Sequence, residues 1–195
     1  MGLYPKLEYV GDVYRPSDDT WLLIKVLEAR RPRGELCLDL GAGSGVLGIY
    51  AILNGICRRV VFVDIVEDAV YSVTVNTTIN GVEHSSVVLW SDDFALRENS
   101  FDVVLANPPY LPADFHVVDI AVEGGLEGYE TAVYFINYAK LVLRPGGKLY
   151  LVYSSLTKPE VILEHLERSG FRVDYEVEKR FFYEVIYVVE CVKSW

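Results

Sequence analysis

The sequence predicts an α/β fold: a seven-stranded, mostly parallel sheet with one antiparallel strand and helices on both faces. Short apolar runs alternate with helical segments over most of the chain, and such alternating units form parallel sheets. The last two apolar runs, 171–177 and 182–190, are β-rich and closely spaced, which is typical of an antiparallel pair. With 195 residues, 51% of them hydrophobic, the chain is large enough for one domain with a sizeable core. We therefore expect a single domain over residues 1–195, in which residues 1–33 form an arm and a helix packed on it.

The N-terminal segment begins with residues 1–16, which contain several tyrosines and two prolines and are expected to be extended. Ser17 is a favourable N-cap for a helix that continues to about residue 30. On these residues alone, a packing helix is the simpler interpretation. The alternative is that Tyr14 and the Asp19–Thr20 turn form one wall of a ligand pocket.

The first predicted strand, residues 35–40, runs into a glycine-rich turn and then a helix. Gly41, Gly43 and Gly45 allow a tight turn and a close approach of a ligand to the backbone. Their spacing differs from the G-x-G-x-x-G of dinucleotide-binding folds. Asp39 at the strand end would repel a pyrophosphate, but it suits a ligand ammonium group. A tight turn without a ligand is the alternative.

The next strand, residues 59–64, also ends in an acid. Asp64 at this position suits the two hydroxyls of a ribose, or alternatively the N-terminus of the following helix. We predict that helix over 67–79, because a second consecutive strand would break the alternation, although its β-branched residues favour a strand. Asn80 and Gly81 would end it.

A third acid follows the predicted strand 86–90. Asp92 would suit the amino group of an adenine at this strand end, with Asp93 as the alternative register. A polar turn without a ligand is the other interpretation.

The fourth strand, residues 101–106, runs into the sequence Asn-Pro-Pro-Tyr. Each proline holds the residue before it in an extended conformation, so Asn107 and Pro108 present the Asn107 amide and the Pro108 carbonyl stiffly. Tyr110 adds a flat ring beside them. The arrangement suits the binding of a planar –NH2 group, although a rigid turn would look the same.

The remaining elements complete the sheet. Residues 111–128 predict a long binding loop or lid, followed by a helix over 130–142 and a turn at 144–147. A strand over 148–153 and a helix over 158–169 come next. In such sheets ligands bind beyond the carboxyl ends of the strands. That edge is where Asp39, Asp64, Asp92 and Asn107 are expected to gather.

Composition restricts the classes of function. A net charge of −10 makes the chain a poor unaided binder of nucleic acid, and could suit a basic protein partner. Its three histidines have no metal-ligand spacing, and no apolar run is long enough to span a bilayer. Cys37, Cys57 and Cys191 are far apart and form no C-x-x-C, so we interpret them as reduced thiols of a cytoplasmic protein.

These motifs together resemble those of class I S-adenosylmethionine (AdoMet) methyltransferases. Asp39–Gly45 resembles the family's first motif, and Asp64, Asp92, Asn107–Tyr110 and Leu143–Gly147 stand at its later ones, in order. The resemblance implies a Rossmann-like fold, AdoMet as cofactor and S-adenosyl-L-homocysteine as product. It implies that Asp39 faces the methionine ammonium, Asp64 the ribose and Asp92 the adenine. The cofactor-binding residues it implies are Tyr14, Thr20, Asp39, Gly41, Gly43, Gly45, Asp64, Asp92 and Asn107.

Residues 13–23 and 124–130 resemble more closely the HemK-type proteins of archaea and eukaryotes, which carry Arg at the position of Leu126. These enzymes methylate the glutamine of the Gly-Gly-Gln motif in class I translation release factors. By this resemblance, the Asn107 side-chain oxygen and the Pro108 carbonyl accept the two amide hydrogens, and Tyr110 packs on the glutamine plane. The alternative is an N-methyltransferase acting on an exocyclic amine of RNA or DNA.

The same resemblance implies a partner. HemK-type proteins of this kind work with a small zinc-binding activator protein that covers an apolar edge. Here the strand 87–90 is the expected docking edge of a heterodimer.

Overall fold

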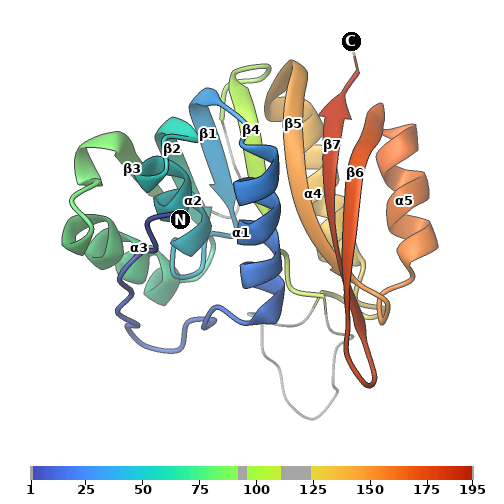
Figure 1. The fold of residues 1–195 in the computed structure, drawn as a ribbon, viewed down its shortest axis with the longest axis horizontal. Coiled ribbons are helices and arrows are strands. Elements are labelled where there is room, and N and C mark those ends of the chain that lie inside the picture. The colour runs from blue at the N-terminus through green and yellow to red at the C-terminus, as the bar shows by residue number, and fades with distance from the viewer. Residues whose placement is uncertain (1, 92–95, 111–123, 195) are drawn as a thin grey trace.

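The protein is a seven-stranded sheet covered by helices on both faces (Figure 1). The computed structural model describes residues 2–91, 96–110 and 124–194. The sheet order is β3-β2-β1-β4-β5-β7-β6, in which β7 is antiparallel to both of its neighbours and the other pairs are parallel. The strands are β1 (Gly34–Leu40), β2 (Cys57–Asp64), β3 (Ser86–Trp90), β4 (Phe101–Ala106), β5 (Leu143–Ser154), β6 (Phe171–Arg180) and β7 (Val185–Lys193). The predicted fold class is therefore confirmed.

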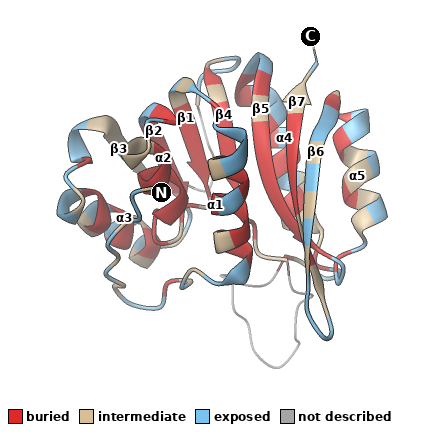
Figure 2. Ribbon diagram, in the orientation of Figure 1, coloured by how far each residue is buried: buried red, intermediate tan, exposed pale blue. Residues whose placement is uncertain are grey.

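Two layers of apolar side chains hold the helices on the sheet. One layer lies between the sheet and α1–α3, and the other lies between the sheet and α4–α5; the central strands are buried on both faces (Figure 2). The helices are α1 (Asp18–Arg30), α2 (Val46–Leu53), α3 (Glu67–Ile79), the short 3-10 helix η1 (Glu83–Ser85), α4 (Glu130–Val142) and α5 (Pro159–Arg168). Within the described residues, no helix is long and apolar enough to cross a membrane. The helix expected over 67–79 is confirmed in spite of its β-branched residues.

Three details differ from expectation. A helix is expected between each pair of the first strands, but the described residues of the connection from β3 to β4, 91 and 96–100, contain none. The expected turn at 144–147 belongs to β5, because Leu143 already pairs with Phe101 and a register shift follows before the regular ladder resumes. The last hairpin turns at 181–184, where the Phe181 N–H donates to the Glu184 carbonyl at 2.7 Å, so β7 begins later than expected.

A disulfide joins Cys37 of β1 to Cys57 of β2. The expectation that the cysteines are reduced thiols is therefore wrong for this pair, whereas Cys191 is free and buried. The two cysteines are 20 residues apart in sequence, but the crossover through α2 makes their strands neighbours, with a Cα–Cα distance of 6.0 Å. Spacing alone cannot show such a pairing, and the disulfide removes the argument from cysteine usage for a reducing compartment.

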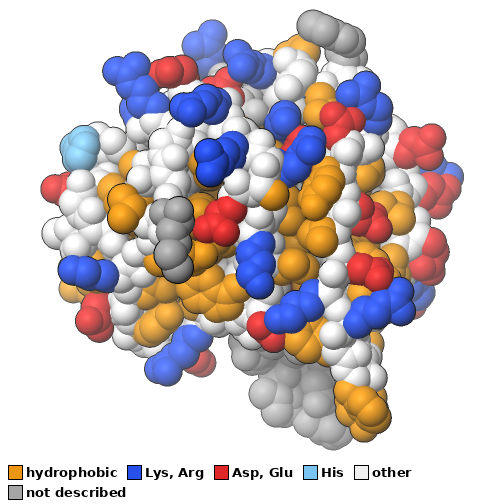
Figure 3. Space-filling view, viewed as in Figure 1, with side chains coloured by type: hydrophobic (Ala, Val, Ile, Leu, Met, Phe, Trp, Pro, Cys, Tyr) orange, Lys and Arg blue, Asp and Glu red, His pale blue; other side chains and the backbone are white. Residues whose placement is uncertain are grey.

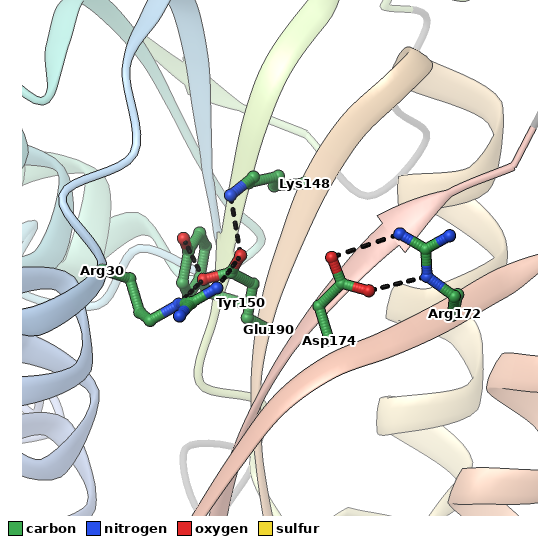
Figure 4. A network of polar contacts seen from close by, with 6 residues as sticks. All are labelled: Arg30, Lys148, Tyr150, Arg172, Asp174 and Glu190. Carbon is green, nitrogen blue, oxygen red and sulfur yellow. Dashed lines mark hydrogen bonds and ion pairs between the residues drawn. The ribbon is translucent and has the colours of Figure 1, made fainter.

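The carboxyl end of α1 is fixed to the sheet by a buried carboxylate (Figure 4). Glu190 on β7 has no exposed surface and accepts hydrogen bonds from Arg30 (2.8 Å), Lys148 (2.7 Å) and Tyr150 (2.7 Å). Burial alone would raise the pKa of Glu190, but the hydrogen bonds from Arg30, Lys148 and Tyr150 outweigh it and hold that pKa at about 2. Because Arg30 is the last residue of α1, this cluster sets the position of the helix on β5 and β7.

The N-terminal arm lies along α3 in an extended conformation, as predicted. Three polar side chains of α3 and its C-cap residue, spaced four residues apart, face the arm and bind the main chain of every second arm residue. In each pair the N–H of an arm residue donates to a side-chain oxygen. The pairs are Asp12 with Asp68, Val10 with Ser72, Glu8 with Asn76, and Lys6 with Asn80. Asn76 also donates to the Ser44 carbonyl at 2.9 Å, so the arm, α3 and the glycine-rich turn are linked.

Candidate active site

A cavity of about 720 Å³ opens at the carboxyl ends of the central strands. It lies where the chain order reverses between β1 and β4, the usual ligand position in such sheets. Its size suits a small-molecule ligand. The predicted site residues that line it are Tyr14, Thr20, Gly41, Gly43, Asp64, Asn107, Pro108 and Tyr110. Asp39 and Gly45 do not line it, and Asp92 lies outside the described residues.

The glycine-rich turn forms the floor of the cavity. Gly41 and Gly43 have φ angles of 68° and 53°, in the left-handed region that favours glycine. A Cβ on Gly43 would meet no atom within 4 Å, so this backbone faces open space, as a close-fitting ligand requires. A Cβ on Gly41 would lie 2.9 Å from the Phe135 ring of α4, so a larger residue would both displace this ring and strain the backbone.

The two acids at the ends of β1 and β2 have different places. Asp39 is buried behind the turn and accepts from the Gly48 N–H at 2.8 Å; burial raises its pKa to about 7. Asp64 reaches the cavity, where its carboxylate accepts from the Gly43 N–H (2.8 Å) and the Val66 N–H (2.9 Å), and burial raises its pKa as well. Asp39 therefore supports the turn from behind, and Asp64 is the acid that a ligand in the cavity would contact.

Asp19, in the first turn of α1, is the centre of a hydrogen-bond cluster. Its carboxylate, 3% exposed, accepts from the Tyr14 hydroxyl (2.8 Å), the Thr20 N–H (2.5 Å) and the Thr20 hydroxyl (3.1 Å). The Asn107 amide nitrogen (3.1 Å) and the Tyr110 hydroxyl (3.3 Å) donate to it as well. Burial and the Asp19 charge raise the pKa of both tyrosines, which therefore remain neutral donors. Of the two interpretations of this segment, the pocket wall matches the geometry.

Asn107 is held in one orientation by this cluster. Its Nδ2 donates to Asp19 and, at 3.2 Å, to the Thr20 hydroxyl, so its Oδ1 is the atom left over. Oδ1 is buried and is the only buried side-chain nitrogen or oxygen of the described residues that has no hydrogen-bond partner. Leaving such an atom unpaired costs about 1–3 kcal/mol. The cavity wall thus contains an acceptor that a ligand N–H would satisfy.

The charge of the lining points to a cationic ligand. No Lys or Arg lines the cavity among the described residues, whereas five acids do. They are Asp12, Asp19, Asp64, Glu130 and Glu184. Such a surface attracts a positively charged ligand and repels phosphates.

Several lining residues could not be identified from the sequence. Thr131, Tyr134 and Phe135 come from the first turns of α4, and Glu184 comes from the turn between β6 and β7. Their contribution depends on how α4 and the last hairpin pack beside β4. The position of α4 directly after a long predicted loop was the single available signal.

Comparisons with known proteins identify the family of the chain. Residues 16–185 match the Methyltransferase small domain family. A Methanocaldococcus jannaschii protein, provisionally named protein N5-glutamine methyltransferase MJ0928, is 31% identical over 191 residues, covering 95% of this chain and 94% of that protein. Human methyltransferase HEMK2 is 29% identical over 195 residues, covering 94% of this chain and 91% of that protein.

A solved structure gives the same family in three dimensions. It is that of the E. cuniculi Mtq2–Trm112 complex responsible for the methylation of the eRF1 translation termination factor. The matched chain superposes with a TM-score of 0.69 and 26% identity, and the match covers 94% of this chain and all of that one. From the family match, the relatives and the cavity, we conclude that the chain belongs to the methyltransferase small domain family.

Proposed function

We propose that this methyltransferase uses AdoMet to methylate the N5 nitrogen of the glutamine in the Gly-Gly-Gln motif of a class I translation release factor. The observation that carries the proposal is the buried, unpaired Oδ1 of Asn107 at the cavity wall. This oxygen can accept a hydrogen bond from a ligand N–H, and the bonds from the Asn107 amide nitrogen to Asp19 and Thr20 fix its orientation. The name of the M. jannaschii relative supports glutamine as the target, and the E. cuniculi complex that methylates eRF1 supports a release factor as the substrate.

The lining fits AdoMet. AdoMet carries its methyl group on a positively charged sulfonium, and its methionine part carries a positively charged ammonium. The five acids of the lining complement both charges. Asp64 can accept from ribose hydroxyls while it keeps its backbone hydrogen bonds, because each carboxylate oxygen has two lone pairs. Asp39 would act on the ammonium through the turn that it supports, and Asp92 would serve the adenine. Tyr14, Thr20 and Gly43 would complete the binding surface.

Asn107 and Pro108 would orient the substrate amide. An amide nitrogen is a poor nucleophile because its lone pair is delocalised into the carbonyl. With one N–H donated to Asn107 Oδ1 and the other to the Pro108 carbonyl, the plane of the amide is fixed and its lone pair is directed at the methyl group. Positioning of this kind provides a large part of the rate in such transfers.

Asp19 would strengthen this acceptor. A carboxylate that accepts from the Asn107 amide nitrogen polarises the amide and increases the negative charge on Oδ1. Positive charge develops on the substrate nitrogen during transfer, so a more negative Oδ1 stabilises the transition state more than the ground state. No general base is required, because the extra proton on the methylated nitrogen leaves readily once the transfer is complete.

A protein partner would complete the enzyme. Strand β3 forms one edge of the sheet and exposes Val87 (52%) and Trp90 (62%). A small zinc-binding activator protein, as in the resembled family, would add to this edge. We expect the isolated chain to be poorly soluble or weakly active, and full activity of a monodisperse isolated chain would contradict the partner.

The proposal is tested by methylation of a release factor with labelled AdoMet, in the presence of the partner. Label should enter the Gly-Gly-Gln protein and not a variant with Gly-Gly-Ala. Persistent labelling of that variant would refute glutamine as the target. Transfer to RNA or DNA, with none to the release factor, would establish the exocyclic-amine alternative, which the net charge of −10 disfavours.

A further inference from the structure

Two aromatic side chains stand exposed at the turn between β6 and β7. Phe182 is 89% exposed and Tyr183 is 86% exposed, the highest values among the large hydrophobic residues that the structure describes. Their rings contact edge to face, with centroids 4.5 Å apart. Figure 1 shows the hairpin extending past the end of the sheet, and Figure 3 shows hydrophobic side chains gathered at its free end. We call this pair of rings the aromatic tip.

The hairpin that carries the aromatic tip is held by hydrogen bonds and an ion pair. The hairpin closes through the Phe181 N–H and the Glu184 carbonyl (2.7 Å), and the Glu184 carboxylate accepts from the Ser154 hydroxyl (2.6 Å). An ion pair of 2.8 Å between Lys179 and Asp18 ties β6 to the start of α1. A partner that binds such a preformed surface loses little conformational entropy.

The tip also stands at the mouth of the cavity. Glu184, the residue after Tyr183, lines the cavity together with Tyr110 and Asn107. A glutamine side chain that reaches Asn107 leaves its own main chain and neighbours outside the cavity, where the tip beside Glu184 can contact them.

We propose that the aromatic tip binds the polypeptide segment that flanks the target glutamine of the substrate protein. The inference rests on the proposed function and names a specificity surface for it. Exposed aromatic rings of this kind are the usual anchors of protein–protein contacts. The bound segment would place apolar side chains and main chain against Phe182 and Tyr183 while its glutamine enters the cavity.

Charge favours a polypeptide over a nucleic acid at this surface. The basic residues nearest the tip are already paired, Lys179 with Asp18 (2.8 Å) and Arg180 with Glu178 (2.8 Å). The adjoining cavity is acidic. Binding of single-stranded nucleic acid by aromatic stacking requires a positively charged groove, and the described residues of this rim form none.

The test compares the wild-type chain with the double variant F182A/Y183A in steady-state methylation of a release factor, with the partner present. We expect the KM for the release factor to rise by roughly tenfold or more, while kcat and the AdoMet dissociation constant stay within about twofold. L141A, which removes an exposed apolar side chain near the far end of α4, is the matched control and should change none of these values.

The outcomes are distinguishable. If the wild type transfers no methyl group to the release factor, the proposed function fails, and this inference fails with it. If wild type and F182A/Y183A methylate it with the same KM, the inference alone is overturned. A photo-crosslinking residue placed at position 182 should join to the Gly-Gly-Gln loop; crosslinks to a distant part of the release factor would also overturn it.

Discussion

The two ends of α1 each hold a buried carboxylate that collects several hydrogen bonds, but the two clusters differ in charge. Glu190, at the carboxyl end, accepts from Arg30 and Lys148, so its negative charge is compensated within the protein. Asp19, at the amino end, accepts from neutral donors, and no Lys or Arg of the described residues forms an ion pair with it. Both carboxylates are almost inaccessible to solvent.

The difference distinguishes a cluster that is satisfied within the protein from one that leaves a charge and an acceptor open at the cavity. At Glu190 every buried polar atom has a partner, as expected of a site that fixes a helix to a sheet. At Asp19 the charge is uncompensated, and the neighbouring Asn107 Oδ1 is unpaired. A cation and an N–H donor would complete this second cluster, and a sulfonium cofactor with an amide substrate supplies both.

The largest effect is expected for Asn107→Ala, which removes the unpaired acceptor. Loss of one such transition-state contact should lower kcat by roughly 10²–10³-fold. AdoMet affinity, measured by calorimetry, should change far less. Asn137→Ala, on the exposed face of α4, is the control. Activity of N107A near the wild-type level would show that Oδ1 is not the acceptor.

At the other end of the helix, Glu190→Gln should destabilise the fold while leaving the chemistry intact. Removing the charge takes the charged acceptor away from Arg30, Lys148 and Tyr150 and should cost about 1–3 kcal/mol of unfolding free energy. Asp174→Asn, which breaks the more exposed pair with Arg172 drawn beside it in Figure 4, should cost much less. Equal costs in denaturant titrations would remove the distinction between the two pairs.

The destabilisation caused by E190Q should depend on pH, because the wild-type Glu190 carboxylate titrates. The folded-state pKa of Glu190 is about 2, below the ordinary value of 4.5, so the carboxylate's contribution to stability is present above about pH 4.5 and is lost as the pH falls towards 2. The difference in unfolding free energy between wild type and E190Q should therefore shrink over this interval.

A smaller effect is expected for Asp19→Asn, which removes the charge at the cavity end of α1 but keeps the size of the side chain. The loss of a charged hydrogen bond to the Asn107 amide should lower kcat by about tenfold to 100-fold. Thermal unfolding should show a folded protein. If D19N is as active as the wild type, polarisation of Asn107 plays no part in the reaction.

The sequence was sufficient to place the candidate site residues at the ends of particular strands. It did not reveal the hydrogen bonds that connect these residues. Asp64 and Asn107 could be placed at neighbouring strand ends, because parallel strands put their carboxyl ends at one edge. The position of Asp19 at the centre of the hydrogen-bond cluster could not be predicted, because Asn107 lies 88 residues away in sequence and only the packing of α1 brings the two residues together. The Cys37–Cys57 disulfide and the Arg30–Glu190 pair depend in the same way on tertiary packing that spacing does not reveal.

The row of hydrogen bonds between the arm (residues 6–12) and the residues 68–80, here called the ladder, has one more consequence. Asn76 and Asn80 each bind both the N–H and the carbonyl of one arm residue, as a neighbouring β-strand would. These contacts involve the main chain of Lys6 and Glu8 and not their side chains. The side chains at positions 6 and 8 can therefore be replaced without loss of these hydrogen bonds, as long as proline is kept out of both positions. What must be preserved is the count of residues from the ladder to Tyr14, because an insertion or deletion there would move Tyr14 out of reach of Asp19.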